Sequence, residues 1–159
     1  MTGMYNRQGY EKIARKFFEE RRAAGKKVLI LFLDMDRLKY INDRYGHEYG
    51  DMAIKKTASV IKNCSGEDAI TIRHGGDEFV VFLKNIDYEH LEPKMHRLME
   101  ELRLTYSQDD KSVTISASAG VALSPANGTT FKELYIAADK ALYQAKHDGK
   151  SCFRCAPTP

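Results

Sequence analysis

The sequence contains no long apolar segment, no dense run of basic residues and only three cysteines among its 159 residues. Its longest purely apolar run, residues 28–33, is far shorter than the roughly 20 residues that a membrane-spanning helix needs. A net charge of +3 without a lysine or arginine cluster gives no support for a nucleic-acid surface, although it allows a small anionic ligand. We therefore expect a cytoplasmic domain with no membrane segment of its own and no nucleic-acid partner.

An odd number of cysteines argues against a disulfide framework and fits a reducing compartment. Cys152 and Cys155 form an isolated C-x-x-C pair near the C-terminus. A zinc site would need a second pair of ligands, and a redox motif would stand early in a βαβ unit. Neither chemistry is expected from these cysteines.

Length and composition are those of one globular domain covering residues 1–159, with 43% hydrophobic and 30% charged residues. Hydrophobic periodicity predicts the order helix, strand, helix, hairpin, helix, strand, helix, strand. We expect these elements near residues 10–25, 27–36, 54–64, 69–83, 91–102, 113–123, 130–146 and 151–155. Hairpins mixed with helices predict an α+β fold, with helices packed around a mainly antiparallel sheet of about five strands.

The hairpin at residues 69–83 carries the most unusual polar residues of the chain. Gly75 and Gly76 separate its two apolar strands, and a Gly-Gly pair in that position predicts a tight turn with positive φ angles. Asp77 and Glu78 follow directly, where the glycine backbone leaves room for a ligand. The alternative interpretation is that these two carboxylates form an ordinary solvated hairpin tip.

A second pair of carboxylates, Asp34 and Asp36, ends the apolar strand at residues 27–36. Residues i and i+2 of a strand point the same way, so both side chains would project from one face. If this strand lies beside the hairpin, Asp34 approaches Asp77 and Glu78, with Asp36 nearby. Such oxygen ligands suit Mg²⁺ or Mn²⁺, completed by waters and substrate phosphates. The alternative is two turn-forming aspartates that simply end a strand.

Three lysines, Lys39, Lys146 and Lys150, could offset the charge of a polyphosphate. Taken one at a time, each is typical of a solvated surface charge. Together with the carboxylates, they point to phosphoryl or nucleotidyl transfer on a nucleoside triphosphate, assisted by two metal ions.

Six segments resemble, in order and spacing, the motifs of the GGDEF family, the diguanylate cyclases. These segments are residues 2–10, 34–43, 46–51, 75–79, 118–122 and 137–150. Residues 75–79 spell the family's signature, and Gly46-His47-x-x-Gly50-Asp51 matches a second motif without change.

The resemblance implies a palm-like α+β domain related to class III nucleotide cyclases and polymerase palms. It also implies condensation of two GTP into cyclic di-GMP plus pyrophosphate, with two Mg²⁺ or Mn²⁺ ions per active site. Each domain of the family holds one GTP, so catalysis would need a homodimer. The family usually pairs its domains through an attached sensory or dimerising segment. The chain would then be the catalytic part of a longer protein, which could be a membrane-linked sensor with this domain in the cytoplasm.

The resemblance implies a role for individual residues as well. The metal ligands would be Asp34, the Met35 carbonyl, Asp77 and Glu78. The proton of the 3′-hydroxyl would go to Asp77 or to Glu78, a choice that stays open. The guanine would be read by Asn42, His47 and Asp51, and a carboxylate facing the guanine N1–H would disfavour adenine. The phosphates would be held by the backbone amides of Arg37, Leu38 and Lys39, together with Lys146 and Lys150.

Five positions depart from the family pattern. Gly66 and Ala69 occupy the places of the inhibitory Arg-x-x-Asp motif, so no inhibitory site is expected. Leu38 replaces a common phenylalanine, and His74 stands where an apolar or aromatic residue is frequent. Lys150 replaces arginine, which keeps the charge but loses the bidentate fork. No required carboxylate is missing, so we expect an active cyclase. The alternatives are a module that binds GTP or cyclic di-GMP without turnover, and a cyclase with another nucleotide choice.

Overall fold

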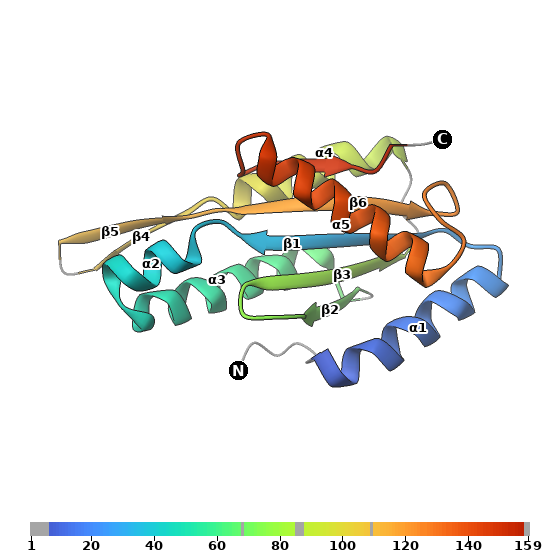
Figure 1. Ribbon diagram of the computed structural model, residues 1–159, viewed down its shortest axis with the longest axis horizontal. Helices are drawn as coiled ribbons and strands as arrows, with labels where there is room; N and C mark the ends of the chain where they lie inside the picture. The colour runs from blue at the N-terminus through green and yellow to red at the C-terminus, as the bar shows by residue number, and fades with distance from the viewer. Residues whose placement is uncertain (1–6, 68, 85–87, 109, 158–159) are drawn as a thin grey trace.

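The computed structural model describes residues 7–67, 69–84, 88–108 and 110–157 (Figure 1). Most of the first family-like segment, residues 2–6, lies outside them. The elements in chain order are α1 (Arg7–Ala23), β1 (Val28–Met35), α2 (Leu38–Tyr45), α3 (His47–Ser65), β2 (Ile70–Arg73), β3 (Glu78–Lys84), α4 (Tyr88–Glu101), β4 (Leu104–Gln108), β5 (Lys111–Ile115), β6 (Ala117–Ser124), α5 (Phe131–His147) and β7 (Phe153–Cys155). None of the described helices is long and apolar enough to span a bilayer.

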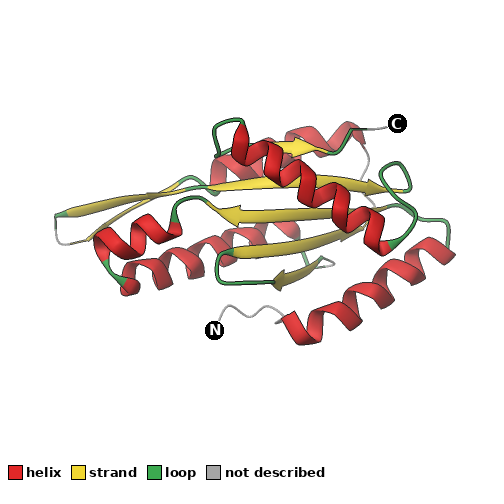
Figure 2. Ribbon diagram, in the orientation of Figure 1, coloured by secondary structure: helices red, strands yellow, loops and turns green. Residues whose placement is uncertain are grey.

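Five strands form the central sheet in the order β2-β3-β1-β6-β7 (Figure 2). β1 lies in the middle and pairs antiparallel with β3 on one side and β6 on the other. β7 runs parallel to β6 at one edge. The predicted α+β architecture, with a mainly antiparallel sheet of about five strands, is therefore confirmed.

Helices cover both faces of the sheet, which explains why β1 is apolar on both sides. On one face, Leu29, Leu31 and Leu33 pack with α3 and α4. On the other face, Val28, Ile30 and Phe32 pack with α1 and α5. These alternating positions divide the core into two layers, and residues 28–33 are buried throughout. β1 is thus the strand on which both layers meet.

The segment after β1 differs from the prediction of a loop followed by one helix. The structure has two helices there, α2 and α3, separated by Gly46 with a φ of 96°. Among the residues of α2, only Ile41 is fully buried, so its helical periodicity is weak in the sequence. Leu38 and Tyr45, three residues before and four after Ile41, also pack against the core. Apolar residues at 38, 41 and 45 have helical spacing, and this pattern could have predicted α2.

The predicted single strand at residues 113–123 is also wrong, because it is divided at Ser116. The part before Ser116 is β5, which pairs with β4 in a separate two-stranded ribbon that extends past the main sheet (Figure 1). The part after it is β6, which is buried at every position, not on one face only. The helices that cover both faces of the sheet account for this burial.

α5 begins at the predicted capping box, which is confirmed. The Thr130 hydroxyl accepts a hydrogen bond from the Glu133 amide at 3.1 Å, and the Glu133 carboxylate accepts one from the Thr130 amide at 3.3 Å. The helix then crosses β6 very closely at Gly120. A Cβ atom at that position would overlap the Ala138 carbonyl oxygen and the Leu142 amide nitrogen. Glycine is required here by the closeness of the helix backbone.

Gly120→Ala is expected to lower the free energy of unfolding by about 3 kcal/mol, because the added methyl group would meet backbone atoms that cannot rotate away. Urea denaturation measures the change. Gly76→Ala is the matched control, since a Cβ there would meet no heavy atom within 4 Å. Equal midpoints for the two variants would contradict the close approach of α5.

Candidate active site

The two acidic segments meet where β1 ends and β3 begins. Asp34 pairs directly with Glu78 across the two strands, and the Met35 amide donates to the Asp77 carbonyl at 3.0 Å. Residues directly opposite each other on antiparallel strands project to the same face, here the face covered by α1 and α5. The expected neighbourhood of Asp34, Asp77 and Glu78 is confirmed at the level of the backbone.

In the described part of the chain, the Asp34 carboxylate has one oxygen with a partner and one without. Its Oδ1 atom is buried and has no hydrogen-bond partner among the described residues, while Oδ2 lies 3.4 Å from the Lys146 Nζ. Burial raises the pKa of Asp34 to about 7; Lys146 opposes this shift, and the nearby Asp77 carboxylate adds to it. A cation at this place would satisfy Oδ1 and favour the ionised form.

Within the described ranges, no three His, Cys, Asp or Glu side chains already form a metal-binding cluster. The site therefore does not resemble a closed all-protein cage. Mg²⁺ seldom uses one, because it keeps several waters and binds through one or two carboxylates together with substrate phosphates. The unpartnered oxygen of Asp34 beside Asp77 fits this mode of binding.

The loop between β2 and β3 differs from the predicted turn. Neither Gly75 nor Gly76 has a φ in the left-handed region, so positive φ is not the reason for these glycines. The amides of His74 and Gly75 both donate to the Glu78 carbonyl, at 2.9 and 3.3 Å. A Cβ on Gly75 would lie 3.4 Å from a Glu78 carboxylate oxygen, whereas the space over Gly76 is open. The glycines therefore keep the surface of the loop clear.

Asp36 is bound by donors of the protein itself. It is 4% exposed, and its carboxylate accepts hydrogen bonds from Ser116 Oγ at 2.8 Å, Ser118 Oγ at 2.7 Å and the Ser151 amide at 3.0 Å. Lys146 Nζ donates a fourth at 2.9 Å. Burial opposes ionisation, but these donors together outweigh it and lower the pKa of Asp36.

Lys146 lies at the end of β1. Besides Asp36, its ammonium group donates to the Met35 carbonyl at 3.2 Å and lies near the Asp34 carboxylate. The main electrostatic role visible here is neutralisation of the acidic strand end. Contact of Lys146 with phosphates, and of the Met35 carbonyl with a metal ion, stay predictions.

Two other predicted phosphate-binding segments lie beside this strand end. α2 starts there from Arg37, which has a left-handed φ of 60° and no capping side chain among the described residues. The amides of Leu38 and Lys39 belong to its first turn, where backbone N–H groups have no intrahelical acceptor. Lys150 is exposed and directly precedes Ser151, whose amide binds Asp36.

The predicted guanine-reading residues come from α2 and α3, which pack against each other. The Asn42 side chain lies against Gly50, and a Cβ on this glycine would overlap its amide oxygen. His47 and Asp51 are exposed and stand four residues apart, hence on one side of α3. The structure thus brings Asn42 next to the helical turn that carries Asp51.

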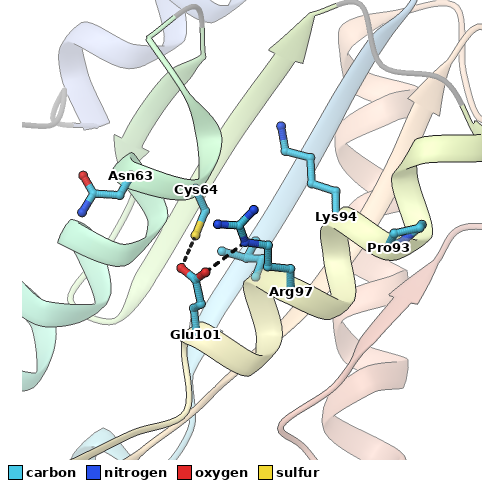
Figure 3. Close-up of a pocket in the computed structure, with 7 residues that line it drawn as sticks. Asn63, Cys64, Pro93, Lys94, Arg97 and Glu101 are labelled. Atoms are coloured by element: carbon cyan, nitrogen blue, oxygen red, sulfur yellow. Dashed lines mark hydrogen bonds and ion pairs between the residues drawn. The ribbon is translucent and has the colours of Figure 1, made fainter.

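A cavity of about 510 Å³ lies elsewhere, between the end of α3 and α4 (Figure 3). There, Glu101 accepts hydrogen bonds from the Cys64 thiol at 2.9 Å and from Arg97 Nε at 3.1 Å. Burial raises the pKa of Cys64 to about 11, which keeps the thiol a neutral donor.

Gly66, one of the two positions of the missing inhibitory motif, ends α3 with a φ of 86°. The absence of product inhibition stays a prediction.

Sequence reasoning missed the serines that bind Asp36. Ser116 and Ser118 are 80 and 82 positions away from it, and no local pattern connects them. It also missed Tyr135, whose hydroxyl lies 3.4 Å from His74 Nε2. For the contact of Tyr135 with His74, the sequence offered one signal: His74 stands where the family commonly has an apolar or aromatic residue.

The family's sequence model, described as diguanylate cyclase, GGDEF domain, matches residues 1–152. The chain belongs to the GGDEF family. This GGDEF domain is 35% identical over 159 residues to the cyclic di-GMP phosphodiesterase PdeR of Escherichia coli, covering all of the chain and 24% of that protein. It is 34% identical over 125 residues to Diguanylate cyclase A of Treponema denticola, covering 77% of the chain and 33% of that protein. The chain thus spans a third or less of either relative.

Solved structures agree with this assignment. The GGDEF domain of YfiN (TpbB) from Pseudomonas aeruginosa superposes with a TM-score of 0.90 at 28% identity, and the whole of each chain is covered. The palm-like α+β fold is therefore that of the family.

Asp36→Ala is expected to lower the free energy of unfolding of the GGDEF domain by about 3 kcal/mol, because it removes the buried charge that pairs with Lys146 and accepts from the buried Ser118 hydroxyl. Chemical denaturation followed by circular dichroism measures the loss. Asp43→Ala, which removes an exposed carboxylate from α2, is expected to change it by less than about 0.5 kcal/mol. Similar losses for both variants would show that Asp36 does not hold the site together.

Proposed function

We propose that this GGDEF domain is a diguanylate cyclase. It condenses two GTP into cyclic di-GMP and releases two pyrophosphates, at the interface of two domains, by two-metal nucleotidyl transfer. The observation that carries the proposal is the buried, unpartnered oxygen of Asp34 beside Asp77, next to the uncapped start of α2. Carboxylates and free backbone amides at one place suit a metal-bound triphosphate.

Asp34, the Met35 carbonyl, Asp77 and Glu78 are the residues that would hold two Mg²⁺ or Mn²⁺ ions. When bound, these ions would lower the pKa of the attacking 3′-hydroxyl and offset charge on the phosphates. The amides of Leu38 and Lys39 would donate to phosphate oxygens from the start of α2, with Arg37 preceding them. Lys146 and Lys150 add positive charge from the end of α5.

Asp77 is the better candidate for accepting the proton of the 3′-hydroxyl. The Glu78 carboxylate is already engaged, since its Oε2 atom lies 3.2 Å from His74 Nδ1. Asp77 influences Asp34 directly, because its carboxylate contributes to the raised pKa of that residue. Asp77 therefore stands beside the proposed metal position without a competing histidine contact.

Asn42, His47 and Asp51, which come from the contacting helices α2 and α3, would bind the guanine. The carboxylate of Asp51 would accept from the guanine N1–H and amino group, which adenine cannot supply in the same arrangement.

The alternative to a catalytic domain is a module that binds GTP or cyclic di-GMP without turnover. It is favoured by the match over the whole chain to PdeR, a protein named for phosphodiesterase activity.

The partner needed for turnover would be a second copy of this domain, because one domain holds one GTP. The chain spans a third or less of the relatives described above, so a sensory or dimerising segment elsewhere in a longer protein would bring the two copies together.

Incubation with GTP and Mg²⁺ is expected to yield cyclic di-GMP, at a rate that rises more steeply than linearly with protein concentration. Asp77→Ala is expected to lower the rate at least about 100-fold, because removal of a metal-binding or proton-accepting group costs that much. Chromatography of the nucleotides measures both. Glu92→Gln, an exposed change on α4, is the matched control. GTP binding without product at any concentration would favour the binding module.

Gly50→Ala is expected to raise the KM for GTP about fivefold to tenfold with little change in kcat, because the new methyl group displaces the Asn42 amide and costs about one hydrogen bond. Steady-state kinetics give both constants, and calorimetry with a non-hydrolysable GTP analogue gives the affinity. Ser59→Ala, on the exposed side of the same helix, is the control. An unchanged KM would place the guanine away from Asn42.

A further inference from the structure

His74 connects the acidic loop with the core under α1 and α5. It stands immediately before the two signature glycines, and its side chain is 15% exposed. Nδ1 lies 3.2 Å from Glu78 Oε2, and Nε2 lies 3.4 Å from the Tyr135 hydroxyl oxygen. The imidazole is thus placed between a carboxylate at the site and a tyrosine of α5.

The chemistry of these partners sets the direction of both hydrogen bonds. An ionised carboxylate only accepts, so His74 Nδ1 must carry the proton that it donates to Glu78. In a neutral imidazole the other nitrogen then accepts, and it does so from the Tyr135 hydroxyl. The chain of hydrogen bonds therefore runs from Tyr135 through His74 to Glu78.

Core aromatic rings hold this chain in place. The His74 ring meets the Tyr10 ring edge-on, with centroids 5.4 Å apart. Tyr135 packs in the same manner on Phe32 of β1, at 4.5 Å. The Glu78 side chain is 51% exposed and would otherwise be free to rotate. Its partner His74 is in turn packed against Tyr10 of α1 and next to Tyr135 of α5.

We propose that His74 is a positioning residue for Glu78, the residue paired with Asp34 across the sheet: it fixes Oε2 and so holds the carboxylate for metal binding. This inference rests on the proposed function. Oε1 has no hydrogen bond to other described residues and stays available to a cation. Gly75 contributes, because the carboxylate folds back over it to reach His74. Hydrogen bonds of this kind orient metal-binding carboxylates, and their loss commonly weakens metal binding tenfold or more.

Three substitutions separate positioning from packing. His74→Asn keeps an amide N–H close to the place of Nδ1, where it can still donate to Glu78. His74→Gln places its amide near Nε2, toward Tyr135, and removes the donor to Glu78. His74→Phe keeps the ring and removes both bonds. Only the first variant retains the donor to Glu78, although it is the smallest of the three side chains and so changes the packing the most.

Mn²⁺ binding, followed by electron paramagnetic resonance in the presence of a non-hydrolysable GTP analogue, is the primary readout. We expect about tenfold weaker Mn²⁺ binding for His74→Phe and His74→Gln, and a change within about twofold for His74→Asn. The KM for GTP is expected to stay within about twofold in all three, because α2 and α3 are untouched. Wild-type Mn²⁺ affinity in His74→Phe, equal loss in His74→Asn, or no Mn²⁺ binding by the intact protein would overturn the proposal.

Nitrogen-15 NMR of the intact protein at neutral pH gives a test that needs neither metal nor a stable variant. The expected tautomer of His74 carries its proton on Nδ1, and a dominant Nε2–H form would overturn the proposal. Failure of the proposed function is distinguishable: no cyclic di-GMP, with the Mn²⁺ differences intact, would leave the role of His74 standing. Normal cyclase activity with equal Mn²⁺ affinity in all His74 variants would contradict the role of His74 and leave the proposed function standing.

Discussion

The buried carboxylate of Asp36 is the interaction on which the rest of the site depends. It gathers donors from three parts of the chain: the residues around the start of β6, the end of α5 and the segment leading into β7. A buried charge is stable only when it is paired and fully hydrogen-bonded, so these segments have to meet where β1 ends. The same ammonium group that neutralises Asp36 also reaches Asp34. Structural support and the electrostatics of the proposed metal position are therefore one arrangement.

This arrangement explains how two neighbouring aspartates on one strand come to differ. Asp36 is surrounded by donors, which lower its pKa, whereas Asp34 has a buried oxygen without a donor, and its pKa rises to about 7. The first residue is satisfied by the protein itself. The second keeps one buried oxygen without a donor among the residues described, which is the condition expected at a binding site rather than in a core. Residue type alone does not distinguish the roles of Asp34 and Asp36, because both are aspartates at the end of the same strand.

Much of the domain could be predicted from local sequence. The central strand and the capping box of α5 follow from an apolar run and a turn motif that act over short distances. The nearness of the two acidic segments was expected only on the condition that the strand at residues 27–36 lies beside the hairpin, which the pairing of β1 with β3 confirms. The rest could not, because it depends on contacts between distant positions. The serine donors of Asp36 could not be predicted, because they lie 80 and 82 residues away from it. The ribbon of β4 and β5 was missed because β5 continues the alternation of β6 without a visible break. The glycines of the signature were assigned to positive φ, which neither of them has; the open space over Gly76 agrees with the other expectation, room for a ligand.

The contact of α5 with β6 has a consequence for control of the domain. Helix backbone touches strand backbone at Gly120, and one turn beyond Leu142 the lysine of the same helix is bound to the end of β1. A helix fastened at two points cannot slide along the sheet without breaking both, and densely packed interfaces of this kind do not deform gradually. In the proposed cyclase, each domain would therefore present its half of the active site without internal rearrangement. A regulatory signal would then act on how often, and in which orientation, two such domains meet, and not on the shape of either one.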